Sequence, residues 1–330
     1  MKIDLPHDFH CSLLASLLSF LNKLECERKE NPEMRVKALE SILSLLLSSP
    51  SDILIVLLKG LCNELTSKPL NENSVHRIST CVHVWSMILS GRFPKLKKKE
   101  LCPVLPQVLM ALQSILQMSS NNIDLMVLTL QATTKLLSLG RHYVQSHHCS
   151  LAFHGSLLVP LNDSKERFPH LFQAQYGLLS SILFNQSEAV YNSVQVFVTC
   201  VKNMLWSLGQ HCNNNKTAQG IQDESLKPQL DSELVCAQKM ARLYQEIATH
   251  KTTLSKYAPY MITDYIQQIQ QVSLQAHVKQ ALVPGVYCLL DISGEHEMAL
   301  LHAVLDKGSR ELFHSLNNDY NKFHKFKGKV

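Results

Sequence analysis

The sequence has 330 residues, of which 45% are hydrophobic and only 18% are charged. Such a chain can bury a large core, which excludes a disordered or collagen-like protein. Its 11 glycines and 12 prolines are too few to form the frequent turns of an all-β fold. The net charge of +5 and the pI near 8.6 suit an acidic partner such as RNA but fall short of the pI above about 9 that is typical of a nucleic-acid-binding domain.

The first part of the chain repeats one pattern, in which leucines and other apolar residues recur three and four residues apart. This spacing places them on one face of an α-helix. It predicts helices over Leu13–Leu24, Val36–Leu46, Ile53–Leu65, Ile78–Leu89, Val104–Leu116 and Ile123–Leu139. Asn31 and Pro32 are typical of a helix start, and Gly140 is well placed to end the sixth helix in a left-handed conformation.

Beyond Gly140 the pattern is less regular, and it fades between His154 and Pro169. Two long amphipathic stretches, Leu171–Phe184 and Val190–Leu208, then predict a helical hairpin. Further helices are predicted over Leu234–Ile247, Met261–Val272, Val286–Ile292 and His296–Leu305, and from Ser309 onward.

Residues 210–230 stand out because they contain an asparagine run and few apolar anchors. We therefore expect a flexible polar loop there, between an N-terminal helical-repeat region (1–209) and a C-terminal helical region (231–330). Successive helices with broad apolar faces predict an all-α fold, arranged as an α-solenoid of stacked antiparallel helix pairs like those of HEAT and ARM proteins. No fixed sequence period is visible, so a globular helical bundle remains the alternative.

Ten cysteines lie far apart and mostly inside apolar helical patterns, where a thiol packs as a small hydrophobe, and this usage indicates a reducing compartment. The apolar stretch Leu13–Leu21 follows Asp4 and Asp8 and precedes no cleavage site of small residues, so we expect no secretory signal. No run approaches the ~18 consecutive apolar residues of a membrane span. The expectation is a soluble protein inside the cell.

Searches for catalytic chemistry find no centre, because the phosphate-binding loop, the dinucleotide fingerprint and the nucleophile elbow are all missing from the sequence. We expect no enzyme activity and no cofactor. Asp291, Glu295 and Glu297 are interpreted as carboxylates at a helix start, where they meet the positive end of the helix dipole. His296 and His302 are six residues apart, which does not match the spacing of a metalloprotease helix.

One group of side chains keeps a metal-dependent enzyme open as an alternative. It lies near a predicted helix end and consists of His142, His147, His148, Cys149 and His154. Zinc sites usually hold their ligands in closely spaced pairs such as CxxC, and no two cysteines here are that close. A polar loop with a helix cap is the simpler interpretation.

Two basic features stand above the background. The first precedes a helix, beside Arg92, and consists of Lys95, Lys97, Lys98 and Lys99. It suits phosphate contacts, a solvated loop or a nuclear-import signal. The second is the C-terminus, where aromatic residues alternate with Lys322, Lys325, Lys327 and Lys329.

Helical spacing separates the two kinds of residue at the C-terminus. The shared apolar face predicts a core position for Leu312, Phe313, Leu316, Tyr320 and Phe323. Lys322 and Lys325 project on the opposite side, and the helix is expected to fray near Phe326. The lysines at 322, 325, 327 and 329 are therefore candidate contacts for RNA phosphates.

The same C-terminal stretch resembles the ending of one family. The resemblance rests on the order of its elements, from Pro284–Ile292 through Leu301-His302 and Gly308–Arg310 to Asp319-Tyr320 and Phe326–Lys329, and more loosely on the helices from Leu101 onward. This order is similar to the unhealthy ribosome biogenesis protein 2 family. Members of that family are longer, so the resemblance implies either their C-terminal portion or a short form.

The resemblance implies a nucleolar, non-catalytic scaffold for early pre-rRNA processing in large-subunit (60S) pre-ribosomes. Its implied partners are a companion scaffold protein, a DEAD-box helicase and pre-rRNA, with no membrane and no small-molecule substrate. The family supplies no catalytic residues. A transport or cytoskeletal adaptor of the same shape is the competing hypothesis.

Overall fold

The computed structural model describes residues 7–26, 32–66, 72–92, 99–119, 122–161, 167–218, 227–272 and 274–325. Every regular element in these ranges is helical, which confirms the predicted all-α class. The chain divides into two compact units, the first comprising Met1–Val159 with Phe184–Ala189 and the second Pro160–Leu183 with Val190–Val330. None of the helices in the described ranges is both long and apolar enough to cross a membrane.

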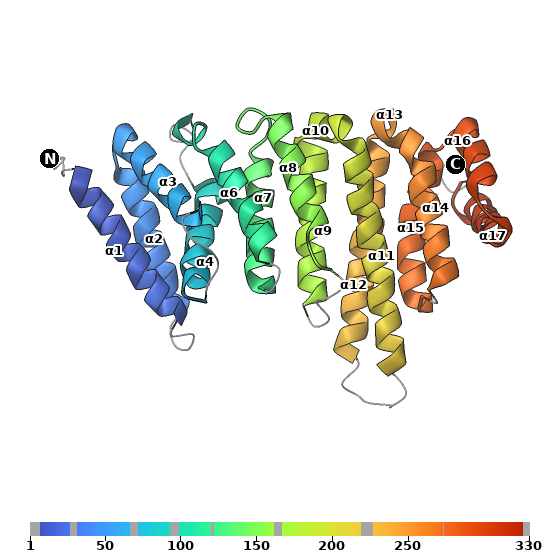
Figure 1. Ribbon diagram of the computed structural model, residues 1–330. Coiled ribbons are helices and arrows are strands. Elements are labelled where there is room, and N and C mark those ends of the chain that lie inside the picture. Colours follow the sequence, from blue (N-terminus) through green and yellow to red (C-terminus); the bar gives the residue numbers. More distant parts are fainter. Residues whose placement is uncertain are drawn as a thin grey trace. The chain divides into compact units, whose positions relative to one another are not determined.

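The first unit is built from the helices at the blue and green end of the chain (Figure 1). They are α1 (His7–Cys26), α2 (Pro32–Ser48), α3 (Ser51–Thr66), α4 (Glu72–Met87) with the π-helical turn η1 (Ile88–Arg92), α6 (Leu105–Met118), α7 (Ile123–Ser138) and α8 (Ser146–Leu157). Helix α6 contacts α3 and α8, while α4 contacts α1 and α7, so the unit has two layers. Leucines form much of the interface, as in α3, whose buried residues are Leu54, Leu57, Leu58, Leu61, Cys62 and Leu65.

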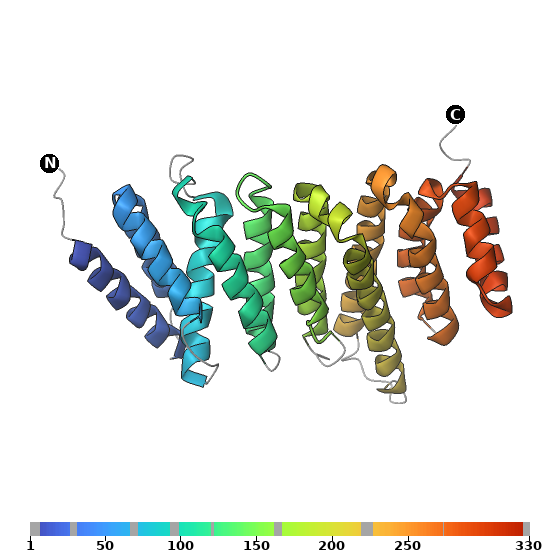
Figure 2. The ribbon, with the colours of Figure 1, turned by 45° about the horizontal axis from the view of Figure 1, so that its top comes forward.

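The second unit contains the helices from α9 to the last helix, α17 (Figure 2). They are α9 (Phe168–Asn185) and α10 (Ser187–Asn192), whose residues 184–189 belong to the first unit, then α11 (Val194–Ala218), α12 (Lys227–Thr249), α13 (Lys251–Leu254), η3 (Ser255–Tyr257), α14 (Ala258–Gln271), α15 (Ala276–Ile292), α16 (Glu295–Val304) and α17 (Lys307–Phe323). Helix α14 contacts α11, α15, α16 and α17, and α12 packs along α15.

The two helices of the predicted hairpin are present as α9 and α11, with the short helix α10 between them. The Phe168 ring at the start of α9 stacks on the His211 ring near the end of α11, with 4.1 Å between centroids. The start of α9 therefore lies beside the C-terminal half of α11. Within each unit, contacts between elements close in sequence are the local arrangement that an α-solenoid requires. A continuous solenoid stays a prediction.

Helix α11 is longer than its sequence pattern indicates. It continues to Ala218, so the first nine residues of the predicted loop are helical, and residues 219–226 lie outside the described residues. The predicted division at residues 210–230 falls inside the second unit.

Helix α8 was missed by the sequence pattern, which predicted an irregular segment there. Its buried residues are Cys149, Ala152, Phe153, Gly155 and Ser156, so small and polar side chains replace the leucine stripe that identifies the other helices. Gly155 is buried because the side-chain amide of Gln113 in α6 lies where a Cβ atom would stand. This helix is held by its close approach to α6 and by one large apolar side chain, the fully buried Phe153.

Helix α15 also differs from its prediction, since it begins at Ala276 rather than near Val286. Pro284 lies inside it, where sequence reasoning expects a helix start. A proline removes the hydrogen bond to the carbonyl four residues earlier, and Gln280 is exposed, so water can solvate that carbonyl.

Gly140 ends α7 as predicted, and it supports a first mutational test. Its φ angle is 89°, in the left-handed region, and a Cβ atom there would meet no other atom within 4 Å. Gly140→Ala is therefore expected to lower the free energy of unfolding by about 1 to 2 kcal/mol through backbone conformation alone. Urea titration of the whole chain measures it.

Gly60 supplies the matched control for this test. It lies at an exposed position away from the ends of α3, and no atom lies within 4 Å of its Cβ position, but its backbone is helical. Gly60→Ala is expected to raise the free energy of unfolding by up to about 1 kcal/mol. Equal effects of the two substitutions would contradict the conformational explanation.

Candidate nucleic-acid interface

Two of the predicted RNA-contacting lysines lie in α17 or directly after it, and the first turn of this helix is firmly fixed. The carboxylate of Asp306 caps the helix, because its Oδ1 accepts a hydrogen bond from the Ser309 backbone N–H at 2.8 Å. This hydrogen bond is the main reason why the pKa of Asp306 lies below its ordinary value. The Ser309 hydroxyl donates to Oε1 of Gln270 at 2.7 Å, which ties the start of α17 to α14.

The far end of α17 is fixed to α15 by a second polar cluster. The Tyr320 hydroxyl donates to Oδ1 of Asp291 at 2.7 Å, and Nε2 of His324 lies 2.9 Å from Oδ2 of the same carboxylate. The Tyr287 ring lies beside both, with centroids 5.7 Å from Tyr320 and 5.2 Å from His324. Burial, followed by the hydrogen bond to Asp291, raises the pKa of Tyr320.

Asp291 therefore does not have the role predicted for it. It lies next to the last residue of α15, so it faces α17 rather than the positive end of a helix dipole. Glu295 and Glu297 do lie in the first turn of α16, and Oε2 of Glu297 accepts from the Gly294 N–H at 3.1 Å. Sequence spacing identifies the second arrangement because it is local, whereas the Asp291 contacts join residues 29 and 33 positions apart.

The apolar face of α17 is buried over most of its length. Phe313 is fully buried and meets the His302 ring edge-on at 5.1 Å, and Tyr320 is buried as well. The prediction that Phe323 lies in the core is wrong, because its side chain is 51% exposed. Phe323 is the last residue of the helix, and the amine of Lys322 lies over its ring, 5.0 Å from the centroid.

The opposite face of α17, together with the turn that follows it, forms a basic stripe, which we define as Lys307, Arg310, His314, Lys322 and Lys325. All five side chains are exposed. At about 100° per residue the four that belong to α17 lie within one third of the helix circumference, a face that also carries the carboxylate of Glu311. Lys322 and Lys325 point outward as predicted, and the other three could have been found from the same helical spacing.

The remaining predicted basic residues are only partly covered by the structure. Lys99 is exposed and begins the helical turn that leads to α6. The other predicted residues, Lys95, Lys97, Lys98, Lys327 and Lys329, lie outside the described residues.

The histidine-rich group near α8 does not converge on one point. His147 and His148 face each other with ring centroids 3.9 Å apart, and Nδ1 of His154 lies 2.8 Å from the Ser150 carbonyl oxygen. Cys149 points into the core, and burial raises the pKa of its thiol to about 12. No three His, Cys, Asp or Glu side chains gather as metal ligands anywhere in the part of the chain that the structure describes.

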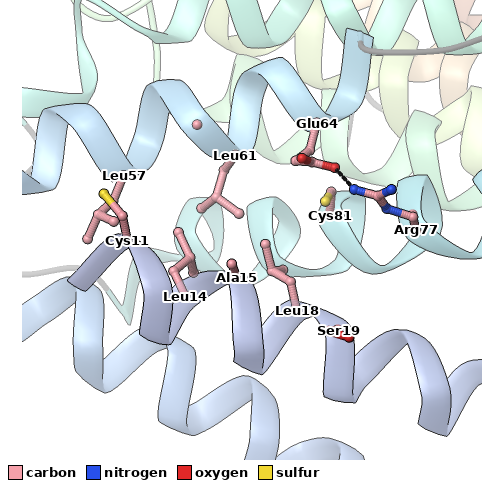
Figure 3. A pocket seen from close by; sticks show the side chains of 11 residues that line it. Cys11, Leu14, Ala15, Leu18, Ser19, Leu57, Leu61, Glu64, Arg77 and Cys81 are labelled. Atoms are coloured by element: carbon pink, nitrogen blue, oxygen red, sulfur yellow. Dashed lines mark hydrogen bonds and ion pairs between the residues drawn. The ribbon is translucent and has the colours of Figure 1, made fainter. Parts of the chain in front are cut away.

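A separate apolar groove of about 470 Å³ lies in the first unit, between α1, α3 and α4. Figure 3 shows Leu14, Leu18 and Leu61 facing one another across it, and the ion pair of Arg77 with Glu64 at one end. Its lining is mainly aliphatic, without a cluster of acidic or basic groups that would select a ligand. It is distinct from the basic stripe, which belongs to the second unit.

Comparison with known proteins identifies the family of the chain. No solved structure matches the chain. A family model described as the Urb2/Npa2 family matches residues 125–329, which include α17 with the polar clusters that hold it and every residue of the basic stripe. This family consists of ribosome biogenesis factors. Because the match covers more than half of the sequence and agrees with the resemblance at its C-terminal end, the chain belongs to the Urb2/Npa2 family.

Proposed function

We propose that the chain is a non-catalytic scaffold that supports large-subunit pre-rRNA processing and pre-ribosome assembly in the nucleolus through protein and rRNA contacts. The observation that carries the proposal is the basic stripe of α17. Four of its five exposed side chains lie on a helix whose two ends are both hydrogen-bonded to neighbouring helices, and the fifth, Lys325, lies in the turn that follows. A rigid helix presents charges in fixed positions, which lowers the entropy lost on binding.

The chemistry of the stripe favours the phosphate backbone over the bases. Lysine and arginine side chains neutralise phosphates without reading sequence, so binding of this kind positions a protein on RNA. Phe323 extends the stripe with an exposed aromatic ring beside Lys322, on which a base can stack. Lys95, Lys97, Lys98 and Lys99 are proposed as a second contact, and Lys327 and Lys329 as a continuation of the first.

The protein partners proposed are those of the family, a companion scaffold protein and a DEAD-box helicase within the same pre-ribosomal particle. The fold suits this role because both units consist of helices, and the exposed faces of these helices can bind partner proteins. In this proposal the protein positions its partners within the particle, and those partners carry out the processing reactions.

Charge reversal tests the proposal. Lys322→Glu combined with Lys325→Glu is expected to keep the helix content of the chain but to weaken its association with large pre-ribosomal particles by about tenfold or more. Each lost phosphate contact weakens binding, and each new carboxylate repels the backbone. Sedimentation of the tagged chain with pre-ribosomal particles in cell extracts gives the measurement.

The matched control is Lys37→Glu combined with Lys59→Glu, which makes the same change in net charge at two exposed positions of the first unit. This control is expected to sediment like the unmodified chain. Unchanged sedimentation of the α17 variant, or an equal loss in both variants, would count against the proposal.

A further inference from the structure

The second unit contains a groove of about 440 Å³ between α11 and the segment formed by η3 and α14. Its lining comes from two stretches that are far apart in sequence, residues 195–202 and residues 257–267. The volume lies within the range of pockets that hold drug-sized molecules, which is also the size of one nucleoside. The basic stripe has no residue in this groove.

The side chains along the groove combine aromatic rings with amide and hydroxyl groups. Tyr257 and Tyr260 lie on the η3–α14 side, and Tyr260 is 51% exposed, so its ring is accessible to a ligand. Gln195 and Gln267 face the groove from opposite walls. Amide groups of this kind pair with base edges, while an exposed ring offers a surface on which a base can stack.

Two lysines lie in or beside the groove, and one of them is paired with a carboxylate. Lys202 lines it and holds its one carboxylate, Asp264, at 2.8 Å. Burial raises the pKa of Asp264, although Lys202 opposes that shift. Lys256 is exposed and directly precedes Tyr257, so a second lysine lies next to the wall of the groove.

We propose that this groove binds a nucleotide of single-stranded RNA, with the base on Tyr260 and the phosphates near Lys202 and Lys256. Bases in an A-form duplex are stacked and paired, so their faces are inaccessible to a tyrosine, and only an unpaired segment fits. The inference rests on the proposed function in taking pre-rRNA as the partner. It adds a second contact and specifies the form of the RNA.

Binding of fluorescently labelled oligouridine to the purified full chain tests the groove directly. Tyr260→Ala is expected to weaken binding by about tenfold, the typical effect of removing a stacking ring, while Tyr260→Phe retains the ring and is expected to bind like the unmodified chain. Lys256→Gln is expected to weaken binding and to lower the slope of log affinity against log salt by about 1. A blunt RNA duplex of the same length is expected to show no dependence on Tyr260.

Two results would overturn the inference. One is oligouridine binding that is identical in Tyr260→Ala and in the unmodified chain. The other is a photoreactive residue at position 260 that crosslinks in cells to a protein segment and not to RNA. Both results are independent of the α17 variants. If the α17 variants lose association with pre-ribosomal particles while Tyr260→Ala binds oligouridine normally, this inference fails and the proposed function stands.

Discussion

Gly285→Ala is expected to lower the free energy of unfolding by about 3 kcal/mol, a large effect for one methyl group. A Cβ atom at Gly285 would lie 2.5 Å from the carbonyl oxygen of Ala241 and 2.6 Å from its Cα atom. Both are backbone atoms of α12, so the clash is relieved only if α12 and α15 move apart. These two helices form the most extensive helix pair of the second unit, and their separation would disturb its whole interface.

Two other glycines show why Gly285 is the sensitive position. A Cβ atom at Gly155 or Gly209 would meet the side-chain amide of Gln113 or Gln268, and a flexible glutamine can swing away where a backbone has to shift. Gly177→Ala is the control in the same unit, since nothing lies within 4 Å of its Cβ position, and it is expected to be neutral or stabilising. Urea titrations that give equal stabilities for Gly285→Ala and Gly177→Ala would refute the argument.

The sequence predicts most of the helices because their signal is local. Leucines at helical spacing identify α3 and α6, and Gly140 identifies the end of α7. The same signal fails at α8, where burial depends on Gly155 approaching Gln113, and at α15, where Pro284 imitates a helix start. In both cases tertiary packing outweighs a local preference, and packing partners are invisible in a single sequence.

The candidate sites divide in the same way. Lys322 and Lys325 are predictable because their outward direction follows from the helix that carries them. The Tyr320–Asp291 hydrogen bond and the groove that joins Lys202 to Tyr260 depend on contacts between distant segments. Helical spacing in the sequence therefore identifies the charged surface of α17. The contacts that hold this helix, and the groove between α11 and α14, are visible only in the folded structure.

Phe313→Ala tests whether the position of the basic stripe matters in addition to its charge. Phe313 is fully buried, and deletion of a buried phenylalanine side chain typically costs about 3 to 5 kcal/mol. The loss is expected to fall mainly on α17, since Phe313 is its only fully buried large side chain among the described residues and the helix contacts α14 along this face. Amide hydrogen exchange in α17 is expected to become faster, while exchange in the first unit stays unchanged.

The effect of Phe313→Ala on association with pre-ribosomal particles shows whether binding requires the basic side chains in fixed positions or only their charge. Phe313→Ala leaves all five side chains of the basic stripe intact, yet it is expected to weaken association with pre-ribosomal particles as strongly as reversal of Lys322 and Lys325, because a detached helix no longer holds its charges in register. Phe313→Leu keeps most of the apolar volume, costs less than about 1.5 kcal/mol and is expected to associate normally. If α17 exchanges rapidly in Phe313→Ala and sedimentation is nevertheless unchanged, charge alone accounts for binding and the fixed geometry of the helix has no part in it.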